Sequence, residues 1–427
     1  MEVIRINGGY PLKGEVRIGG SKNDALAVIP ASLLIQGVSV LHNVPHISDV
    51  EKLLEILRSM GASANFRSDG ALEIDATHIS TTETPHDLVR QMRASFNLLG
   101  VLLARFGDAS VAMPGGCNIG TRPVNFHIKG LESLGAELRF EHGIYNGKAA
   151  RLKGANLYLE FPSAGATQHL MCAACYAEGE TVIENCAQEP EIVNLAHYLN
   201  ACGGSISGMG TPTITIHGVS SLHPAEFNII PDRLQVGTYA VAAAITGGNV
   251  KIINAYPDHC RPVLSKLQEI GVDVKTSEDG INISRKGRLR ATDIKTMPHP
   301  GFPTDMQQPF VALLSVAEGT SMVTETVYES RFRYTTELQR MGADIKVEGP
   351  TAVISGVPQL TGAPVSCTDL RGGAAIVVAG LAAHGETRVS ELDHIDRGYE
   401  NFVTNLQLLG ADIIRTPLET PGRVPLA

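Results

Sequence analysis

Leu57-Arg-Ser-Met-Gly-Ala62 has five further versions along the chain. They are Leu131-Glu-Ser-Leu-Gly135, Leu199-Asn-Ala-Cys-Gly203, Leu267-Gln-Glu-Ile-Gly271, Leu338-Gln-Arg-Met-Gly342 and Leu406-Gln-Leu-Leu-Gly410. Successive glycines are 74, 68, 68, 71 and 68 residues apart. In each copy an apolar helical pattern ends at the glycine, which can take the left-handed backbone conformation, and a strand pattern follows. The repeat predicts six related blocks.

The length of the repeat indicates the class of fold. Solenoid repeats run from about 20 to 50 residues, so a unit near 70 residues is large enough to be a small βαβ-type block. Alternating segments such as Thr213-Ile-Thr-Ile216 supply the strands of these blocks. We therefore expect an α/β protein whose six blocks are gathered into two domains of three.

Composition excludes several classes of protein. The 427 residues are 43% hydrophobic and 19% charged, which is ordinary for a globular chain. A net charge of −9 without a basic run argues against a nucleic-acid partner. No apolar run of 18 residues occurs, the start lacks signal-peptide features, and seven cysteines are scattered through the chain. These features predict a cytoplasmic protein without membrane insertion.

A glycine-broken loop, Met113-Pro-Gly-Gly-Cys-Asn-Ile-Gly-Thr-Arg122, carries the most unusual thiol. Pro114, Gly115 and Gly116 exclude regular structure and let the backbone approach a ligand, so Cys117 is expected on a surface loop. A thiol beside a cation such as Arg122 suits acid, nucleophilic or redox work. A β-turn that merely contains cysteine explains this stretch equally well.

Charged residues near glycines suggest an anionic ligand. In Gly19-Gly-Ser-Lys-Asn-Asp24, Ser21 or Asn23 can cap the following helix, and Lys22 opposes the helix dipole unless an anion binds there. A solvated lysine is the alternative. Arg93, Arg371 and Arg397 lie in similar small-residue settings, where guanidinium groups would hold phosphate or carboxylate. Taken singly, each arginine is better explained by a surface ion pair.

Two other features concern acid–base and redox chemistry. Asp305, in Phe302-Pro-Thr-Asp-Met-Gln307, could act as a general base, although a turn-stabilising carboxylate is an equal alternative. Cys172-Ala-Ala-Cys175 has no second cysteine pair, and its apolar neighbours favour the buried face of a helix over a zinc or redox site. No motif requires a metal or a cofactor.

Six motifs together resemble the UDP-N-acetylglucosamine 1-carboxyvinyltransferase family from about Ile4 to Ile414. The motifs are Ser21-Lys-Asn23, Met92-Arg-Ala-Ser95, Pro114-Gly-Gly-Cys-Asn-Ile-Gly-Thr-Arg-Pro123, Phe302-Pro-Thr-Asp-Met-Gln307, Glu325-Thr-Val-Tyr-Glu329 and His394-Ile-Asp-Arg-Gly-Tyr399. The resemblance implies a two-domain inside-out α/β barrel with three units per domain. It places the first domain at 21–229 and the second at 1–20 plus 230–415. We expect the tail at 416–427 to be flexible.

The resemblance also implies a reaction. The enolpyruvyl group of phosphoenolpyruvate would pass to the 3′-hydroxyl of UDP-N-acetylglucosamine with release of phosphate, which begins peptidoglycan synthesis and so supports cell-wall biogenesis, cell shape and division. Asp305 would accept the hydroxyl proton, and Cys117 would protonate C3 or form an adduct, which would make it the site of alkylation by fosfomycin. Lys22 and Arg397 complete the implied catalytic set.

The binding residues are carried over by motif position. Those implied for phosphoenolpyruvate are Lys22, Asn23, Arg93, Arg122, Asp369, Arg371 and Arg397. Those implied for UDP-N-acetylglucosamine are Asn23, Arg93, Arg122, Pro123, Val124, Asn125, Phe126, His127, Ser163, Gly165, Asp305 and Val327. The chain departs from common family patterns at Asn125, Phe161 and Gln235.

Three other interpretations remain. An enolpyruvylshikimate-phosphate synthase would share the fold and phosphoenolpyruvate, but the cysteine loop and the Asp305 segment favour the UDP-sugar enzyme. A catalytically idle UDP-sugar-binding paralogue has no need to keep Cys117, Asp305, Lys22 and Arg397. A thiol redox protein would require a resolving cysteine near Cys117, and none is close in sequence. Protein partners and oligomeric state are not indicated.

Overall fold

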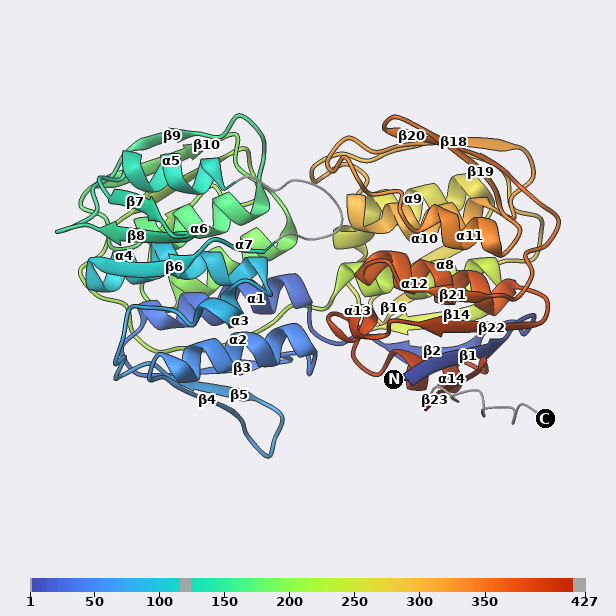
Figure 1. Cartoon of the computed structure of the whole chain (residues 1–427), viewed down its shortest axis with the longest axis horizontal. Coiled ribbons are helices and arrows are strands. Elements are labelled where there is room, and N and C mark those ends of the chain that lie inside the picture. The colour runs from blue at the N-terminus through green and yellow to red at the C-terminus, as the bar shows by residue number, and fades with distance from the viewer. Residues whose placement is uncertain (1, 116–123, 418–427) are drawn as a thin grey trace, which may run out of the picture. The chain divides into compact units, whose positions relative to one another are not determined.

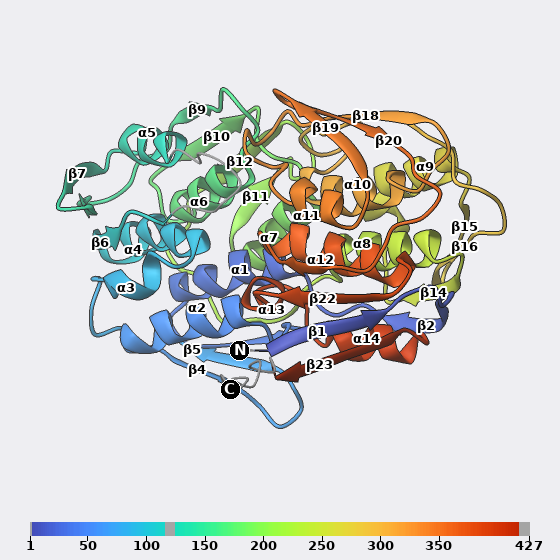
Figure 2. The ribbon, with the colours of Figure 1, turned by 45° about the vertical axis from the view of Figure 1, so that its right-hand side comes forward.

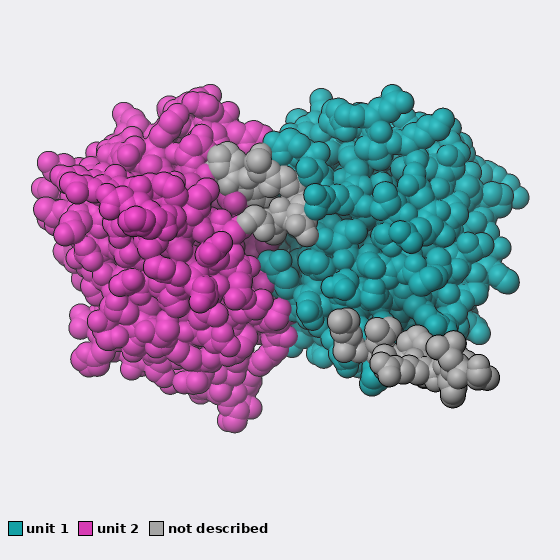
Figure 3. All heavy atoms as spheres, viewed as in Figure 1, with its two compact units in different colours: residues 1–18, 233–297, 301–427 teal, residues 19–232, 298–300 magenta. Residues whose placement is uncertain are grey.

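The computed structural model describes residues 2–115 and 124–417. The chain divides into two compact units, drawn in different colours in Figure 3. Unit 1 comprises residues 1–18, 233–297 and 301–427, and unit 2 comprises 19–232 and 298–300. Each unit has its own apolar core. Whether they coincide with the expected domains 21–229 and 1–20 plus 230–415 stays a prediction.

The described strands of unit 2 form three sheets (Figure 1). The first has the order β13-β3-β5-β4, with β3 Val38–His42, β4 Ser63–Phe66, β5 Leu72–Asp75 and β13 Glu226–Asn228. The second has the order β6-β8-β7, with β6 Asp108–Ala112, β7 Glu137–Glu141 and β8 Ile144–Lys148. The third has the order β11-β12-β10-β9, with β9 Asn156–Tyr158, β10 Glu180–Glu184, β11 Ser205–Ser207 and β12 Thr213–His217.

The described strands of unit 1 also form three sheets. The first has the order β21-β22-β1-β23, with β1 Glu2–Asn7, β21 Pro364–Ser366, β22 Glu386–Ser390 and β23 Asp412–Pro417. The second has the order β15-β16-β14-β2, with β2 Lys13–Arg17, β14 Asn249–Ile253, β15 Asp273–Ser277 and β16 Gly280–Ser284. The third has the order β17-β18-β20-β19, with β17 Ile294–Lys295, β18 Thr320–Thr324, β19 Asp344–Glu348 and β20 Thr351–Ser355.

The sheets repeat one pattern. In the five four-stranded sheets, three strands pair antiparallel and one edge strand pairs parallel. All six repeat glycines, from Gly61 to Gly410, have positive φ between 91° and 104°, as the sequence predicts. The α/β class is therefore correct. The described strands lie in separate sheets and close no barrel.

Several helices are buried on nearly every side because they are rich in alanine, glycine and branched apolar residues. In unit 1 these are α8 (Arg233–Ile245), α10 (Gln307–Leu314) and α12 (Leu370–Ala382), which pack against one another (Figures 1 and 2). In unit 2, α4 (Leu98–Phe106) packs against α1 (Lys22–Ala31) and α6 (Ala164–Ala174). The first turns of α1, α6 and α12 carry expected site residues, and this packing fixes the position of these helices.

The remaining described helices cover or connect the sheets. They are α2 Ser48–Ser59, α3 His86–Val89, α5 Asn125–Ser133, α7 Pro190–Ala201, α9 Arg261–Ile270, α11 Thr335–Arg340, α13 Asp393–Asp396 and α14 Phe402–Leu408. Four short 3₁₀ helices are η1 Ser32–Leu34, η2 Arg93–Asn97, η3 Pro257–Cys260 and η4 Thr304–Met306. None of the helices in the described part of the chain is long and apolar enough to cross a membrane.

One expectation about the end of the chain is wrong. Thr416 and Pro417, which we expected in a flexible tail, belong to β23 and pair with Val3 and Glu2 of β1. The reason is that β1 supplies hydrogen-bonding partners along its whole length, from Glu2 to Asn7. Residues 418–427 lie outside the described residues.

Candidate functional site

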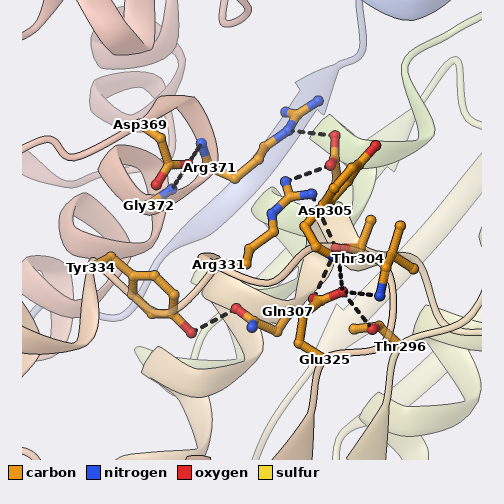
Figure 4. A network of polar contacts seen from close by, with 12 residues as sticks. Thr296, Thr304, Asp305, Gln307, Glu325, Arg331, Tyr334, Asp369, Arg371 and Gly372 are labelled. Atoms are coloured by element: carbon orange, nitrogen blue, oxygen red, sulfur yellow. Dashed lines mark hydrogen bonds and ion pairs between the residues drawn. The ribbon is translucent and has the colours of Figure 1, made fainter. Parts of the chain in front are cut away.

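Asp305 is the centre of a charged cluster in unit 1 (Figure 4). It lies in η4, and about a quarter of its side chain is exposed. Its Oδ1 accepts a hydrogen bond from Arg331 Nη2 at 2.6 Å, and its Oδ2 accepts one from Arg371 Nε at 3.2 Å. Both arginine side chains are only 3% exposed. One carboxylate is therefore held by two separate buried guanidinium groups.

The start of α12 orients Arg371. Asp369 is the N-cap, and its Oδ1 accepts from the backbone N–H groups of Arg371 at 3.0 Å and Gly372 at 2.9 Å. A Cβ at Gly372 would approach Asp369 Oδ2 and Thr368 Oγ1 to 2.7 Å, so glycine leaves room for this cap. The capped turn directs the Arg371 guanidinium toward Asp305 (Figure 4).

Arg397 lies two residues before Tyr399, whose ring the Arg371 guanidinium contacts. The Arg371 guanidinium carbon is 5.2 Å from the centre of the Tyr399 ring, within the range of a cation–π contact. Arg397 is half-buried and ends α13, and Gln235 Nε2 donates to Gly398 O at 3.4 Å. Gln235, one of the departures from the family pattern, thus contacts the segment that carries Arg397.

Glu325 joins the Asp305 turn to the segment containing Val327. Its buried carboxylate accepts from Thr304 Oγ1 at 2.9 Å through Oε2, and from Thr296 Oγ1 at 2.9 Å through Oε1. Oε1 also accepts from Val327 N at 2.8 Å. One carboxylate therefore positions both the residue before Asp305 and the expected nucleotide contact at Val327.

Lys22 has a protein partner in unit 2. Ser21 caps α1 by accepting from Asp24 N at 3.4 Å, as one of the two expected caps, while Asn23 is half-buried in the first turn. Lys22 is nearly buried, and its Nζ lies 2.7 Å from Asp49 Oδ2. Asp49 therefore relieves part of the charge conflict for which the sequence suggested a bound anion.

A second group in unit 2 forms around His127. Gly165, in the first turn of α6, would place a Cβ 3.5 Å from His127 Cε1 and Nε2. Ser163 caps the same helix by accepting from Ala166 N at 3.3 Å. Burial, and then the charge of Arg93, lowers the pKa of His127 to about 3. Arg93, His127, Ser163 and Gly165 thus gather at the start of α6.

The expected nucleotide segment is described only in part. Val124 is buried before α5, Asn125 is exposed and Phe126 is half-buried. Cys117, Arg122 and Pro123 lie outside the described residues. The rejected cysteine pair is buried as expected: Cys172 and Cys175 are 3% and 1% exposed, and burial raises the pKa of Cys175 to about 12.

Our interpretation of the sequence missed Arg331, Glu325 as a positioning group, and His169, whose Nδ1 lies 2.7 Å from His127 Nδ1. Arg331 lies in Glu329-Ser-Arg-Phe-Arg333, a mostly charged and polar stretch in which no local signal distinguishes it from Arg333. His169 lies in the apolar pattern of a buried helix, which was a usable signal.

Comparisons with known proteins agree with the motifs. The family model described as EPSP synthase (3-phosphoshikimate 1-carboxyvinyltransferase) matches residues 6–406. The chain is 52% identical to UDP-N-acetylglucosamine 1-carboxyvinyltransferase 3 of Caldanaerobacter subterraneus subsp. tengcongensis, over 97% of this chain and 99% of the relative. It is 50% identical to the UDP-N-acetylglucosamine 1-carboxyvinyltransferase of Halothermothrix orenii, over 96% and 98% of the two chains.

Solved structures support the same relationship. The enolpyruvyl transferase NikO from Streptomyces tendae superposes with a TM-score of 0.87 at 27% identity, over 97% of this chain and 99% of its own. EPSP synthase from Acinetobacter baumannii, at 19% identity, superposes with a TM-score of 0.76 over 97% and 100% of the chains and so shares the fold. The protein is therefore an enzyme that belongs to the carboxyvinyltransferase family, which includes EPSP synthase and the UDP-N-acetylglucosamine 1-carboxyvinyltransferases.

Proposed function

We propose that this protein transfers the enolpyruvyl group of phosphoenolpyruvate to the 3′-hydroxyl of UDP-N-acetylglucosamine and releases phosphate. The observation that carries the proposal is the high identity to curated relatives over nearly the whole chain. The Asp305 cluster supports it, because a carboxylate and two buried guanidinium groups meet within hydrogen-bonding distance. A base for the hydroxyl and cations for an anionic substrate are what this reaction needs.

The chemistry assigns a role to each group. Asp305 accepts the proton of the 3′-hydroxyl as its oxygen attacks C2 of phosphoenolpyruvate, and Cys117 delivers a proton to C3. Loss of phosphate from C2 and of a proton from C3 then restores the double bond. Lys22, Arg93, Arg122, Arg371 and Arg397 hold the phosphate and carboxylate groups, with Asn23 and Asp369 beside them. Such cations offset the repulsion between two anionic substrates and fix their orientation.

Arg331 joins this set by its position. Its Nη2 contacts Asp305 Oδ1 while its Nη1 donates to Thr304 Oγ1 at 3.0 Å, so its planar group holds the Asp305 turn at two points. The other nucleotide-sugar contacts are those implied by the motifs: Pro123, Val124, Asn125, Phe126, His127, Ser163, Gly165 and Val327.

The finer architecture and the cellular role belong to the same proposal. The repeated sheets and central helices suit six units arranged as two inside-out α/β barrels, with domains near 21–229 and 1–20 plus 230–415. The reaction would supply the first committed intermediate of peptidoglycan synthesis in the cytoplasm. In this role the enzyme acts on small molecules, and neither nucleic acid nor a membrane is a partner.

The test is phosphate release from phosphoenolpyruvate by the purified protein, with and without UDP-N-acetylglucosamine. We expect release that depends on the UDP-sugar, is abolished by Cys117→Ala and is largely kept by Cys117→Asp, because aspartic acid can still deliver a proton. Release with shikimate 3-phosphate but not with the UDP-sugar would favour an enolpyruvylshikimate-phosphate synthase. UDP-sugar binding without release would identify an idle paralogue.

A further inference from the structure

His169 lies in the middle of α6 and has no exposed surface. Its two ring nitrogens have different neighbours. Nε2 lies 2.6 Å from the backbone N of Gly100, near the start of α4, and Nδ1 lies 2.7 Å from His127 Nδ1. The imidazole of His169 therefore connects a helix N–H group to a second imidazole.

These contacts determine where the protons lie. An amide N–H can only donate, so His169 Nε2 accepts, and the proton of a neutral His169 is on Nδ1. This proton is donated to His127 Nδ1, which must then be the acceptor, so the proton of His127 is on Nε2. A reversed order would place two donors against each other at Gly100 or between the rings.

The surroundings keep both rings neutral. Phe96, itself buried, presents T-shaped contacts to His127 at 5.5 Å and to His169 at 5.7 Å between ring centres. Burial lowers the pKa of both histidines, and the charge of Arg93 lowers that of His127 further. Neutral rings make the order of donors and acceptors unique.

This series of hydrogen bonds ends at His127 Nε2, and the surroundings of that atom point to a ligand site. His127 is 7% exposed, and in the described part of the chain its Nε2 has no hydrogen-bond partner. The same atom faces Gly165, in the first turn of the eleven-residue helix α6, which Ser163 caps. A helix N-terminus, a nearby arginine and a buried N–H group together suit an acceptor oxygen.

We propose that His169 is a positioning residue that holds the His127 proton on Nε2, so that His127 presents a donor to an oxygen of bound UDP-N-acetylglucosamine. The identity of the ligand rests on the proposed function. In the opposite tautomer, His127 would present a lone pair to that oxygen, and the two would repel. His169 sets the donor without needing to touch the ligand.

Gly100 belongs to the same hydrogen-bonded arrangement, because its N–H group donates to His169 Nε2. A Cβ at this position would lie 2.4 Å from His169 Cδ2 and 2.6 Å from Nε2, so any side chain there must displace the imidazole. Gly100→Ala therefore displaces the His169 ring from the side of α4, while both histidines are still present in the protein.

The direct test is the tautomer of His127, read from two-bond ¹H–¹⁵N NMR correlations of ¹⁵N-histidine-labelled protein and assigned with His127→Gln. We expect the Nε2–H form in the wild type. His169→Gln keeps one acceptor and one donor and should preserve this form, whereas His169→Leu should raise the Nδ1–H fraction. A wild-type His127 in the Nδ1–H form would overturn the proposal.

Binding supplies the second readout. By calorimetry, His169→Leu and Gly100→Ala should weaken UDP-N-acetylglucosamine about tenfold, as expected for one misdirected hydrogen bond, with a parallel rise in its KM. The KM for phosphoenolpyruvate and kcat should change much less, and His169→Gln should stay within about twofold of the wild type. His217→Leu, at an exposed histidine of β12, is the matched control.

The outcomes separate this proposal from the proposed function. Full-strength UDP-sugar binding by a folded His169→Leu overturns the positioning role even if phosphate release is normal. If that variant does not fold, the wild-type tautomer and Gly100→Ala decide. Absence of phosphate release from a wild type that has the Nε2–H tautomer and binds the UDP-sugar overturns the proposed function alone.

Discussion

At the scale of single residues, the planar shape of the Arg331 guanidinium is expected to matter for activity, because this group holds the turn that carries Asp305. Its guanidinium reaches Thr304 and Asp305 together, whereas lysine offers a single ammonium group. We expect Arg331→Lys to lower kcat/KM on the order of 100-fold, because small misplacements of a reacting group cost about that much. Steady-state phosphate release measures the effect. The control is Arg333→Lys, at an exposed position two residues away, and an equal loss there would contradict the explanation.

At the scale of elements, the buried histidine pair makes the packing of α4, α5 and α6 depend on pH. The unfolded chain takes up protons on these histidines near pH 6.5, while the folded state keeps them neutral, with a His127 pKa of about 3. Below pH 6.5 the unfolded state therefore binds more protons, and stability falls as pH falls. The expected loss is about 1.4 kcal/mol per pH unit for each histidine.

Urea unfolding between pH 7 and pH 5 measures this dependence. His169→Gln removes one of the two titrating rings, so its free energy of unfolding should decline less steeply than that of the wild type. His217→Gln, which alters an exposed histidine of β12, is the matched control. Identical slopes for wild type and His169→Gln would show that burial of His169 does not contribute to acid destabilisation.

At the scale of the whole molecule, unit 1 depends on both ends of the described chain. Strand β1 lies between β22 and β23, and Ile4 and Ile6 are buried in the core. Deleting residues 2–7 would leave two unpaired strand edges and expose apolar surface, so we expect loss of cooperative unfolding and aggregation. Circular dichroism and soluble yield test this. Arg5→Ala removes a half-exposed ion pair with Glu386 and should fold normally.

Sequence reasoning succeeded where the signal was local. The six repeat glycines, the Ser21 cap and the burial of Cys172 and Cys175 each depend on a few neighbouring residues. It was wrong about Thr416 and Pro417, whose strand depends on β1. The roles of Cys117 and the other site residues stay predictions, although Asp305, Asp369 and Arg371 lie in one cluster.

Helix ends, turns and the order of the blocks follow from the chain alone, because backbone preference and apolar periodicity act over a few residues. The tertiary structure decided which distant groups meet. Arg331 and Arg371 are 26 and 66 residues from Asp305, and His169 is 42 residues from His127. Such contacts arise from the packing of whole helices and sheets, so no local pattern specifies which guanidinium holds the carboxylate or which nitrogen of His127 carries its proton.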